Sequence, residues 1–231
     1  MNDSTDLGGF TINEWTKKRD ILKHNLEYSP HWEEAVNWYN ERLKRRYFDP
    51  MKRMEKYATG EGFSLVTIHC SIIEHFASIT QGKIHNHKRN NLSPAYEYSS
   101  SSQHFQEFLN NSYLFSEYFT ASSGSCSIFD SSDFYSNVRC ALLHSACTKN
   151  NWRINTLSCG HSNPDQKIMT INGQGIKRLF RDILAKKLSK FLENYKIEIK
   201  ESTIKRLYFA RIIDHLCEIR PDDNYPWWRE R

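Results

Sequence analysis

The spacing of apolar and polar positions predicts helices along most of the chain. Apolar residues recur at helical spacing after Ser29 and Pro30, two residues that are typical of a helix cap and a first helical turn. The segment "FSLVTIHCSIIEHFASI", residues 63–79, is apolar around nearly its whole circumference, so we expect a helix at the centre of the fold. The run "FYSNVRCALLHSACTKN", residues 134–150, is apolar enough to predict a further packed helix.

The pattern changes beyond Thr148. The runs "WRINTL" and "KIMTI" are strand-like and a turn-rich stretch separates them, which predicts a small β-hairpin. Gly173 and Gly175 precede a long amphipathic helix over residues 176–195, and a last helix is expected from about Thr203 to Ile219. The predicted fold class is therefore mainly α, with N-terminal helices, a helical core and a small C-terminal β-hairpin followed by two helices.

We expect three successive segments within one compact domain. Residues 1–60 are an N-terminal helical segment, residues 61–150 are the helical core, and residues 151–231 hold the hairpin and the C-terminal helices.

Composition narrows the class of protein further. The hydrophobic fraction of 39%, the charged fraction of 26% and the net charge of +5 describe a globular protein for which contact with nucleic acid is permitted but not required. The N-terminus does not resemble a signal peptide, and no run of 18 apolar residues occurs, so no membrane span is expected. We expect a cytoplasmic protein whose six cysteines are reduced.

Two side chains whose burial costs free energy lie in the apolar helix predicted over residues 134–150. Arg139 and His144 are five positions apart, which places them roughly 140° apart on a helix of 3.6 residues per turn. One isolated helix therefore does not point both side chains at one atom. They converge only where a second helix, or a second copy of this one, completes a cleft, which indicates a homodimer.

These residues carry a family resemblance. "RCALLH" resembles the Arg-x4-His signature of the HEPN superfamily of helical ribonucleases, which occur in bacterial toxin and phage-defence systems. The wider phrase "FYSNVRCALLH…TKNNW", followed by a hairpin, is similar to uncharacterised bacterial proteins of this type. The resemblance covers about residues 61–147. It implies a HEPN-like helical bundle that cuts RNA without metal or cofactor in a groove between two protomers, in a defence or toxin–antitoxin context with an antitoxin or defence-system protein as a further partner.

The resemblance also assigns roles to individual residues. His144 would handle protons near neutral pH while the 2′-hydroxyl of RNA attacks, and Arg139 would hold the phosphate through two hydrogen bonds. Lys149, just past the helix, would contact the RNA backbone. Glu74 on the central helix would orient His144 or pair with Arg139, or form a structural ion pair only. Cys140 occupies a position where the family prefers Asn, Asp or His, and a thiol donates hydrogen bonds poorly.

Four other patterns stand beside this interpretation. A second Arg-x4-His pair, Arg19 and His24 in "RDILKH", lies in a charged helix typical of a solvated surface. Cys140, His144 and Cys147 lie close to one helical face, Cys159 and His161 follow in the hairpin turn, and four of these five residues would make a tetrahedral zinc site. The loop "KIHNHKRNN" contacts RNA phosphates or is merely solvated, while "YPWW" near the end of the chain is typical of a packed anchor.

The alternatives in function follow from these patterns. One is a non-catalytic HEPN-like module that binds RNA, a nucleotide or a protein partner and uses Arg139 structurally. The other is a zinc-stabilised helical interaction protein.

Overall fold

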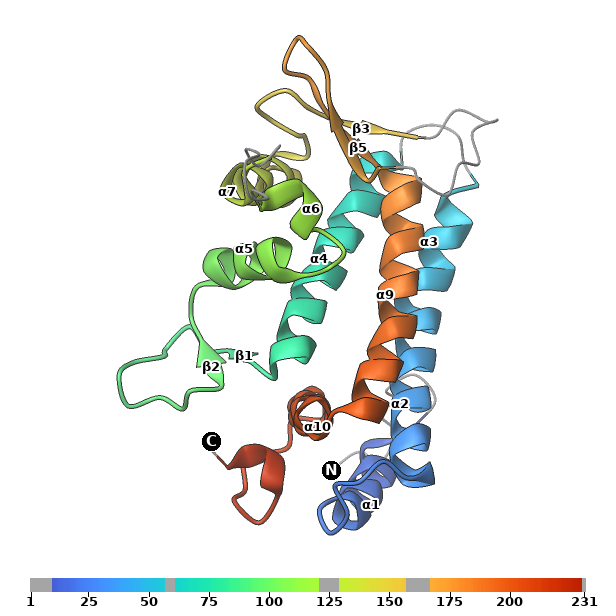
Figure 1. Cartoon of the computed structure of the whole chain (residues 1–231), viewed down its shortest axis with the longest axis vertical. Helices are drawn as coiled ribbons and strands as arrows, with labels where there is room; N and C mark the ends of the chain where they lie inside the picture. The colour runs from blue at the N-terminus through green and yellow to red at the C-terminus, as the bar shows by residue number, and fades with distance from the viewer. Residues whose placement is uncertain (1–9, 57–60, 121–128, 157–166, 230–231) are drawn as a thin grey trace. The chain divides into compact units, whose positions relative to one another are not determined.

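The chain forms two compact units, each assembled from separate stretches of sequence. The structure is a computed structural model that describes residues 10–56, 61–120, 129–156 and 167–229 (Figure 1). Unit 1 consists of the stretches Met1–Pro50, Phe76–Ser100 and Leu192–Arg231, and unit 2 consists of Met51–His75 and Ser101–Phe191. Each unit draws on all three segments expected from the sequence, and the division of the chain near residues 60 and 150 stays a prediction.

Helices make up most of the described chain, which confirms the mainly α prediction. The α-helices are α1 (Ile12–Leu22), α2 (Pro30–Leu43), α3 (Asp49–Met54), α4 (Gly62–Gln81), α5 (Ser101–Asn111), α6 (Ser116–Phe119), α7 (Ser131–Phe134), α8 (Ala141–Ser145), α9 (Arg181–Glu201) and α10 (Thr203–Leu216). Two π-helical turns, η1 (Lys44–Phe48) and η2 (Tyr135–Cys140), and a short 3₁₀-helix, η3 (Pro226–Trp228), complete the helical set.

The first π turn explains how the chain tolerates Pro50. The sequence predicts an interruption or a kink there, because proline lacks the backbone N–H that a helix interior needs. In the structure α2 begins at Pro30 as expected, passes through η1 and continues as α3, whose second residue is Pro50. The wider turn of η1 shifts the backbone hydrogen bonds just ahead of the proline, so the chain stays helical through it.

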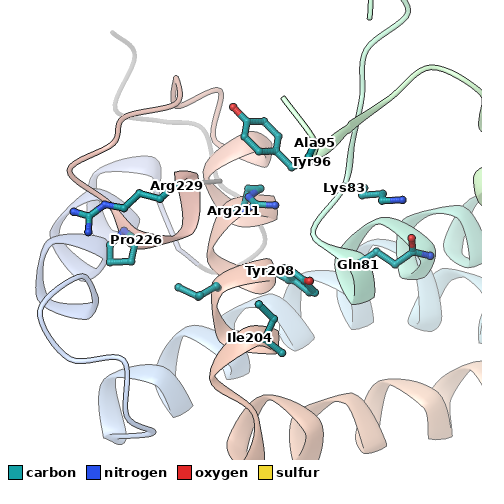
Figure 2. A pocket seen from close by; sticks show the side chains of 10 residues that line it. Gln81, Lys83, Ala95, Tyr96, Ile204, Tyr208, Arg211, Pro226 and Arg229 are labelled. Carbon is teal, nitrogen blue, oxygen red and sulfur yellow. The ribbon is translucent and has the colours of Figure 1, made fainter. Parts of the chain in front are cut away.

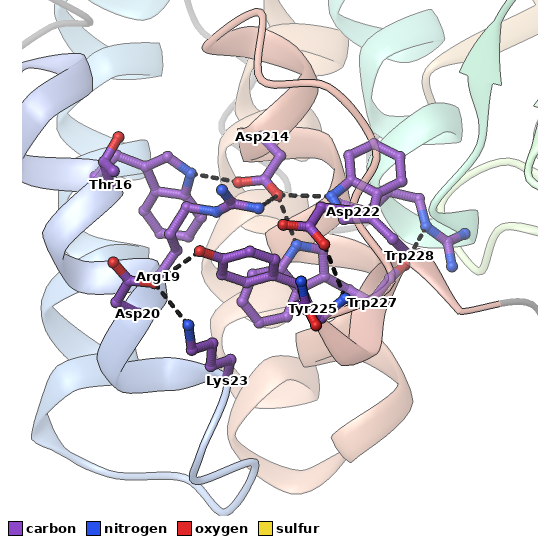
Figure 3. Close-up of polar contacts among 12 residues, drawn as sticks. Thr16, Arg19, Asp20, Lys23, Asp214, Asp222, Tyr225, Trp227 and Trp228 are labelled. Atoms are coloured by element: carbon purple, nitrogen blue, oxygen red, sulfur yellow. Dashed lines mark hydrogen bonds and ion pairs between the residues drawn. The ribbon is translucent and has the colours of Figure 1, made fainter.

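A buried carboxylate ties the ends of unit 1 together (Figure 3). Asp214 of α10 has no exposed surface and accepts hydrogen bonds from Arg19 Nη2 at 2.7 Å and from three indole N–H groups. These indoles belong to Trp15 at 2.7 Å, Trp227 at 2.7 Å and Trp228 at 2.8 Å. Burial raises the pKa of Asp214, against the opposing effects of these hydrogen bonds and of the Arg19 charge. The "YPWW" segment is therefore a packed anchor, as its composition indicates.

Unit 2 contains a three-stranded sheet whose pairing differs from the predicted hairpin. The strands are β3 (Trp152–Asn155), β4 (Met169–Ile171) and β5 (Lys177–Phe180), and their order is β3-β5-β4 (Figure 1). β5 pairs antiparallel with β4 and parallel with β3, so the expected pairing of β3 with β4 is wrong. The hairpin is instead β4–β5. Residues 177–180 were expected to open a helix, and α9 begins only at Arg181. Two further short strands in unit 1, β1 (Ile84–His85) and β2 (Glu97–Tyr98), pair parallel to each other.

Helix α4 contains the apolar run expected at the centre of the fold. Its length and composition are those of a segment that can cross a membrane, and half of its most apolar window is buried inside the protein. The core helix of a water-soluble protein has the same two properties, so the expected absence of a membrane span stays a prediction.

One histidine of α4 is fully buried in unit 2. His69 has no exposed surface, and neither ring nitrogen has a hydrogen-bond partner among the residues that the structure describes. Burial, and then the positive charge of Arg181, lower the pKa of His69 to about 3. The folded protein therefore favours the neutral imidazole near neutral pH.

We expect His69 to make the protein sensitive to mild acid. The histidine of the unfolded chain titrates near pH 6.5, so its contribution to stability is complete above that pH and falls as the pH decreases toward 3. At pH 5 the loss is about 2 kcal/mol of unfolding free energy. Urea unfolding at pH 7.5 and pH 5 would measure it. His69→Met should flatten this pH dependence, whereas His24→Met, which changes an exposed histidine, should leave it as in wild type. Equal pH dependence in all three proteins would contradict the assignment.

Candidate active site

The Arg-x4-His segment forms one helix with a π turn at its centre. Asp130 caps α7 by accepting a hydrogen bond from Ser132 N at 2.8 Å, and the chain then runs through η2 into α8 without a break. Arg139 lies in η2 and His144 in α8. Because a π turn advances less than 100° per residue, the two side chains are offset by less than the roughly 140° of a regular α-helix.

The buried face of this helix packs on aromatic rings of unit 2. Phe134 contacts Phe105, Phe119 and Trp152, with ring centroids 6.3, 5.8 and 5.2 Å away. Val138, Ala141 and Leu142 continue the buried face. Phe134, Val138 and Ala141, which recur at helical spacing, are buried, whereas Ser145 at the next such position is exposed. This packing fixes the helix on one side and leaves the neighbouring face for Arg139.

Arg139 is held by Glu74 of α4. Its Nη2 lies 2.7 Å from Glu74 Oε2, and the two side chains are 19% and 20% exposed. The guanidinium carbon is 5.4 Å from the centre of the Tyr135 ring, a cation–π contact. Burial lowers the pKa of Arg139, but the hydrogen bond and charge of Glu74 outweigh it, so the net pKa is raised. The structure thus fixes a permanent positive charge that solvent still reaches.

Cys140 takes part in the same cluster as an acceptor. Arg139 Nη1 lies 3.9 Å from Cys140 Sγ. Below them Cys70 is buried, and burial raises the pKa of its thiol to about 12. The described cysteines 70, 140, 147 and 217 are all free thiols. Cys140 contacts the arginine directly, so its side chain helps to set the position of the guanidinium.

His144 is solvent-exposed, which corrects the expectation that it would be costly to bury. It lies in the last turn of α8. Among the residues that the structure describes, it has no hydrogen-bond or ion-pair partner. The structure joins Arg139 with Glu74 and Cys140 but does not join His144 to them. Within one copy of the chain, the imidazole faces solvent.

The loop after His144 is pinned to the motif helix by an aspartate that the sequence analysis did not single out. Asp133 of α7 accepts hydrogen bonds from Asn137 at 2.9 Å, Trp152 Nε1 at 2.8 Å, Lys177 Nζ at 2.6 Å, and Asn150. Burial raises the pKa of Asp133, but these hydrogen bonds reverse the shift and leave it below the usual range. The sequence around Asp133 gives no sign of its role, because its hydrogen-bond partners belong to three other elements of the fold.

The conformation of this loop exposes Lys149. Ala146, Asn150 and Asn151 have positive φ angles of 49°, 49° and 62°. These left-handed residues turn the chain away from α8. The backbone N–H of Lys149 donates to Asn137 O at 2.9 Å, and its side chain is exposed. The backbone of the lysine expected to contact RNA is therefore fixed to the motif helix, and its side chain is open to solvent.

The second Arg-x4-His pair is occupied by the anchor of unit 1. Arg19 is 5% exposed, pairs with Asp214 and stacks on Tyr225 at 3.5 Å from the ring centre. His24 is exposed and lies beyond the end of α1. The guanidinium of Arg19 has no open face for a substrate phosphate, which favours the pair at 139 and 144.

The other two patterns are the candidate zinc ligands and the basic loop. In the part of the chain that the structure describes, no three His, Cys, Asp or Glu side chains are close enough to hold a metal ion, and the zinc candidates Cys159 and His161 lie outside it. In the basic loop, His87, Lys88, Arg89 and Asn90 are all exposed. A loop that contacts RNA phosphates and a loop that is merely solvated would both be exposed in this way.

Chemically, the motif helix carries a fixed guanidinium and, at a separate position, an exposed imidazole. A planar cation that is partly open to solvent can bind a phosphate diester, and an exposed imidazole can exchange protons near pH 7.

Comparison of the chain with protein-family models, with curated proteins and with solved structures finds no match in any of the three.

Proposed function

We propose that the chain is a HEPN-like endoribonuclease that cleaves RNA without a metal ion. The observation that supports this most is the state of Arg139. An arginine at the first position of the Arg-x4-His pattern is held at 2.7 Å by Glu74, one-fifth exposed, on a helix that also presents His144 to solvent. A purely structural arginine in this chain looks different, as the nearly buried Arg19 demonstrates.

The proposed reaction is an internal transesterification. A neutral His144 imidazole removes the proton of a ribose 2′-hydroxyl, whose oxygen attacks the adjacent phosphorus and forms a 2′,3′-cyclic phosphate. The bond from phosphorus to the 5′-oxygen breaks, and that oxygen takes a proton from a protonated imidazole. Arg139 donates two hydrogen bonds to the phosphoryl oxygens as negative charge accumulates on them. Glu74 limits the motion of the guanidinium and keeps it in place for the incoming phosphate.

The placement of His144 supports a site made by two copies. Its imidazole does not contact Arg139 or Glu74, so the acid–base group and the phosphate group of one copy do not complete a site. In the proposal His144 of one protomer meets Arg139 of the other across a two-fold axis, and the homodimer holds two equivalent sites. A cytoplasmic defence or toxin–antitoxin role, with an antitoxin or defence-system partner, follows from the resemblance and belongs to the same proposal.

A second candidate function rests on the same ion pair. Glu74 already uses part of the hydrogen-bonding capacity of Arg139, as in a structural pair. In that case the chain is a non-catalytic module of HEPN-like fold that binds RNA or a protein partner.

We expect the exposed histidines to separate these candidates. Wild-type protein should cleave a mixed RNA substrate in the presence of EDTA, and His144→Ala should be about 100-fold slower because it removes the acid–base group. His24→Ala is the matched control, since His24 is also exposed and also ends an Arg-x4-His pattern. Cleavage products would be quantified by denaturing gel after circular dichroism confirms folding.

Each outcome of this assay assigns the function. Loss of cleavage in His144→Ala alone supports the ribonuclease. Absence of cleavage by wild type favours the non-catalytic module, and equal cleavage by all three proteins shows that the motif is structural.

A further inference from the structure

One face of the three-stranded sheet in unit 2 carries two arginines in a row. Arg153 of β3 is the register partner of Arg178 of β5, and Arg178 is the register partner of Thr170 of β4. Register partners point to the same face of a sheet, so these three side chains cross the sheet in a line. The strands β3 and β5 lie side by side (Figure 1), about 4.8 Å apart in the hydrogen-bonding direction. Arg153 is exposed and Arg178 is partly exposed.

The opposite face of the sheet packs on the motif helix. Trp152 and Lys177, which are also register partners, both donate to Asp133 of α7, at 2.8 and 2.6 Å. Successive residues of a strand alternate between the two faces, so Arg153 and Arg178 point away from this contact. We call the face that carries the two arginines the outer face of the sheet.

No counter-charge accompanies the two arginines. Among the residues that the structure describes, neither side chain has a hydrogen-bond or ion-pair partner. The strands β3, β4 and β5 contain no Asp or Glu. Lys177 on the opposite face differs, because Asp133 offsets its charge. Like charges in register on neighbouring strands repel each other, so a bound anion would relieve a repulsion that the folded chain leaves in place.

The cations that line a pocket of unit 1 are arranged differently (Figure 2). The pocket has a volume of about 220 Å³, and its lining comes from the end of α4, the stretch before β2, α10 and the segment from η3 onward. Figure 2 shows Lys83 on one side of α10 and Arg229 on the other. Arg211 donates to Trp227 O at 2.6 Å and to Gly82 O at 2.9 Å. The pocket therefore does not gather its cations at one point, as the row on the sheet does.

We infer that the outer face of the sheet binds single-stranded RNA through its phosphates. A guanidinium donates two parallel hydrogen bonds to a phosphate, and two neighbouring guanidiniums suit a chain that carries a phosphate on every residue. The Thr170 hydroxyl adds a neutral donor at the end of the row. Contacts of this kind hold a strand without reading its sequence. The choice of RNA among polyanions rests on the proposed function, and it holds for the ribonuclease and for the RNA-binding module alike.

The position of β3 connects this face with Lys149. β3 is an edge strand, and Trp152 N donates to Lys149 O at 3.1 Å where the strand begins. An RNA strand that leaves the row at Arg153 therefore passes the loop that carries Lys149. The outer face holds the strand and takes no part in the cleavage step.

Fluorescence anisotropy of the full chain with a short labelled RNA strand tests the inference. Every 2′-hydroxyl of the strand is methylated, so the strand cannot be cleaved through 2′-hydroxyl attack. We expect Arg153→Gln and Arg178→Gln each to weaken binding about tenfold, because a charge-assisted hydrogen bond to phosphate is lost. The slope of log affinity against log salt concentration should fall by about 0.7 for each arginine removed. Arg53→Gln is the matched control, since Arg53 is an exposed arginine of α3 in the same unit.

The stability of the variants separates binding from a structural role. Both glutamine substitutions in the row remove a repulsion, so these variants should unfold at the same urea concentration as wild type or at a higher one. Arg178→Lys retains the charge, so it should keep the wild-type salt slope while it loses affinity with the forked hydrogen bonds. A lower unfolding midpoint in both glutamine variants would assign the row to the fold and overturn the inference.

Three further outcomes would also overturn it. These are no binding of the methylated strand by wild type, equal weakening by Arg53→Gln and the row variants, and binding of poly-glutamate as tight as that of RNA, which would assign the face to an acidic protein. The test stands apart from the proposed cleavage. Binding that depends on the row without cleavage of unmodified RNA removes the ribonuclease alone, and cleavage without such binding removes the outer face alone.

Discussion

Arg139→Lys is expected to slow RNA cleavage by about 10²–10³-fold while the folded protein keeps its stability to within about 1 kcal/mol. Lysine retains the positive charge and so can still pair with Glu74, 2.7 Å from the present guanidinium. It lacks the planar fork that donates two parallel hydrogen bonds to a phosphate. A residue with only a structural role would tolerate this exchange, so the substitution separates the two functions proposed for the cluster.

The measurement combines cleavage rates in EDTA with urea unfolding. Arg53→Lys is the matched control, because Arg53 is an exposed arginine of α3 in the same unit. We expect it to cut like wild type. If Arg139→Lys retained full activity, phosphate binding by Arg139 would be refuted.

Mixing two inactive variants tests the two-copy site directly. Arg139→Lys and His144→Ala, unfolded together and refolded at equal amounts, should form hybrid dimers in half of the molecules. Each hybrid carries one intact site if Arg139 and His144 come from different protomers, so about a quarter of the wild-type activity returns. No recovery, despite confirmed hybrid formation, would show that each site is built within one protomer.

Asp214→Ala is expected to lower the free energy of unfolding by about 3–5 kcal/mol, the largest effect on stability among the substitutions considered. The change leaves Arg19, which is 5% exposed, without its carboxylate partner. It also leaves three indole N–H groups of the anchor without an acceptor. A buried donor without an acceptor costs about 1–3 kcal/mol, so several such losses compound.

Two further variants test whether the lost carboxylate causes the loss of stability in Asp214→Ala. Asp214→Asn keeps one acceptor oxygen and should lose less stability than alanine, whereas Asp223→Ala, which changes an exposed residue of the following loop, should stay within about 0.5 kcal/mol of wild type. Urea unfolding monitored by tryptophan fluorescence is suited to this, since Trp227 and Trp228 are both buried in the anchor. A loss below about 1 kcal/mol in Asp214→Ala would contradict a stabilising role for the carboxylate.

The local elements of the fold could be predicted where the signal is itself local. Ser29 and Pro30 mark the start of α2 because a helix start depends only on its first turn. The apolar run in α4 and the packed "YPWW" anchor follow from composition alone. The pairing of β3 with β5 did not follow, since strands of four residues carry no register information, and residues 177–180 also fit the pattern of the helix that follows them.

For the candidate site, the sequence identified one pairing as an alternative and missed other contacts. Glu74 was expected to orient His144, to pair with Arg139 or to form a structural ion pair only, and the structure shows the pair with Arg139 across 65 positions of sequence. The π turn at Tyr135–Cys140 was not predicted, because a helix of 3.6 residues per turn was expected throughout this segment. Asp133 and the pocket of unit 1 were missed for one reason. Asp133 and Lys177 lie 44 residues apart, and the pocket lining comes from stretches of the chain that are distant in sequence.

The interleaving of the two units constrains when each can fold during synthesis. Unit 2 includes residues up to Phe191, so translation must reach β5 and the start of α9 before its sheet can close. Unit 1 contains α1, which is translated before the other described helices, yet it waits for α10, which brings the carboxylate that Arg19 and Trp15 need. The N-terminal helices therefore leave the ribosome long before their partners. During that interval their unpaired apolar and charged groups are exposed, the condition in which partly made chains are open to chaperones and proteases.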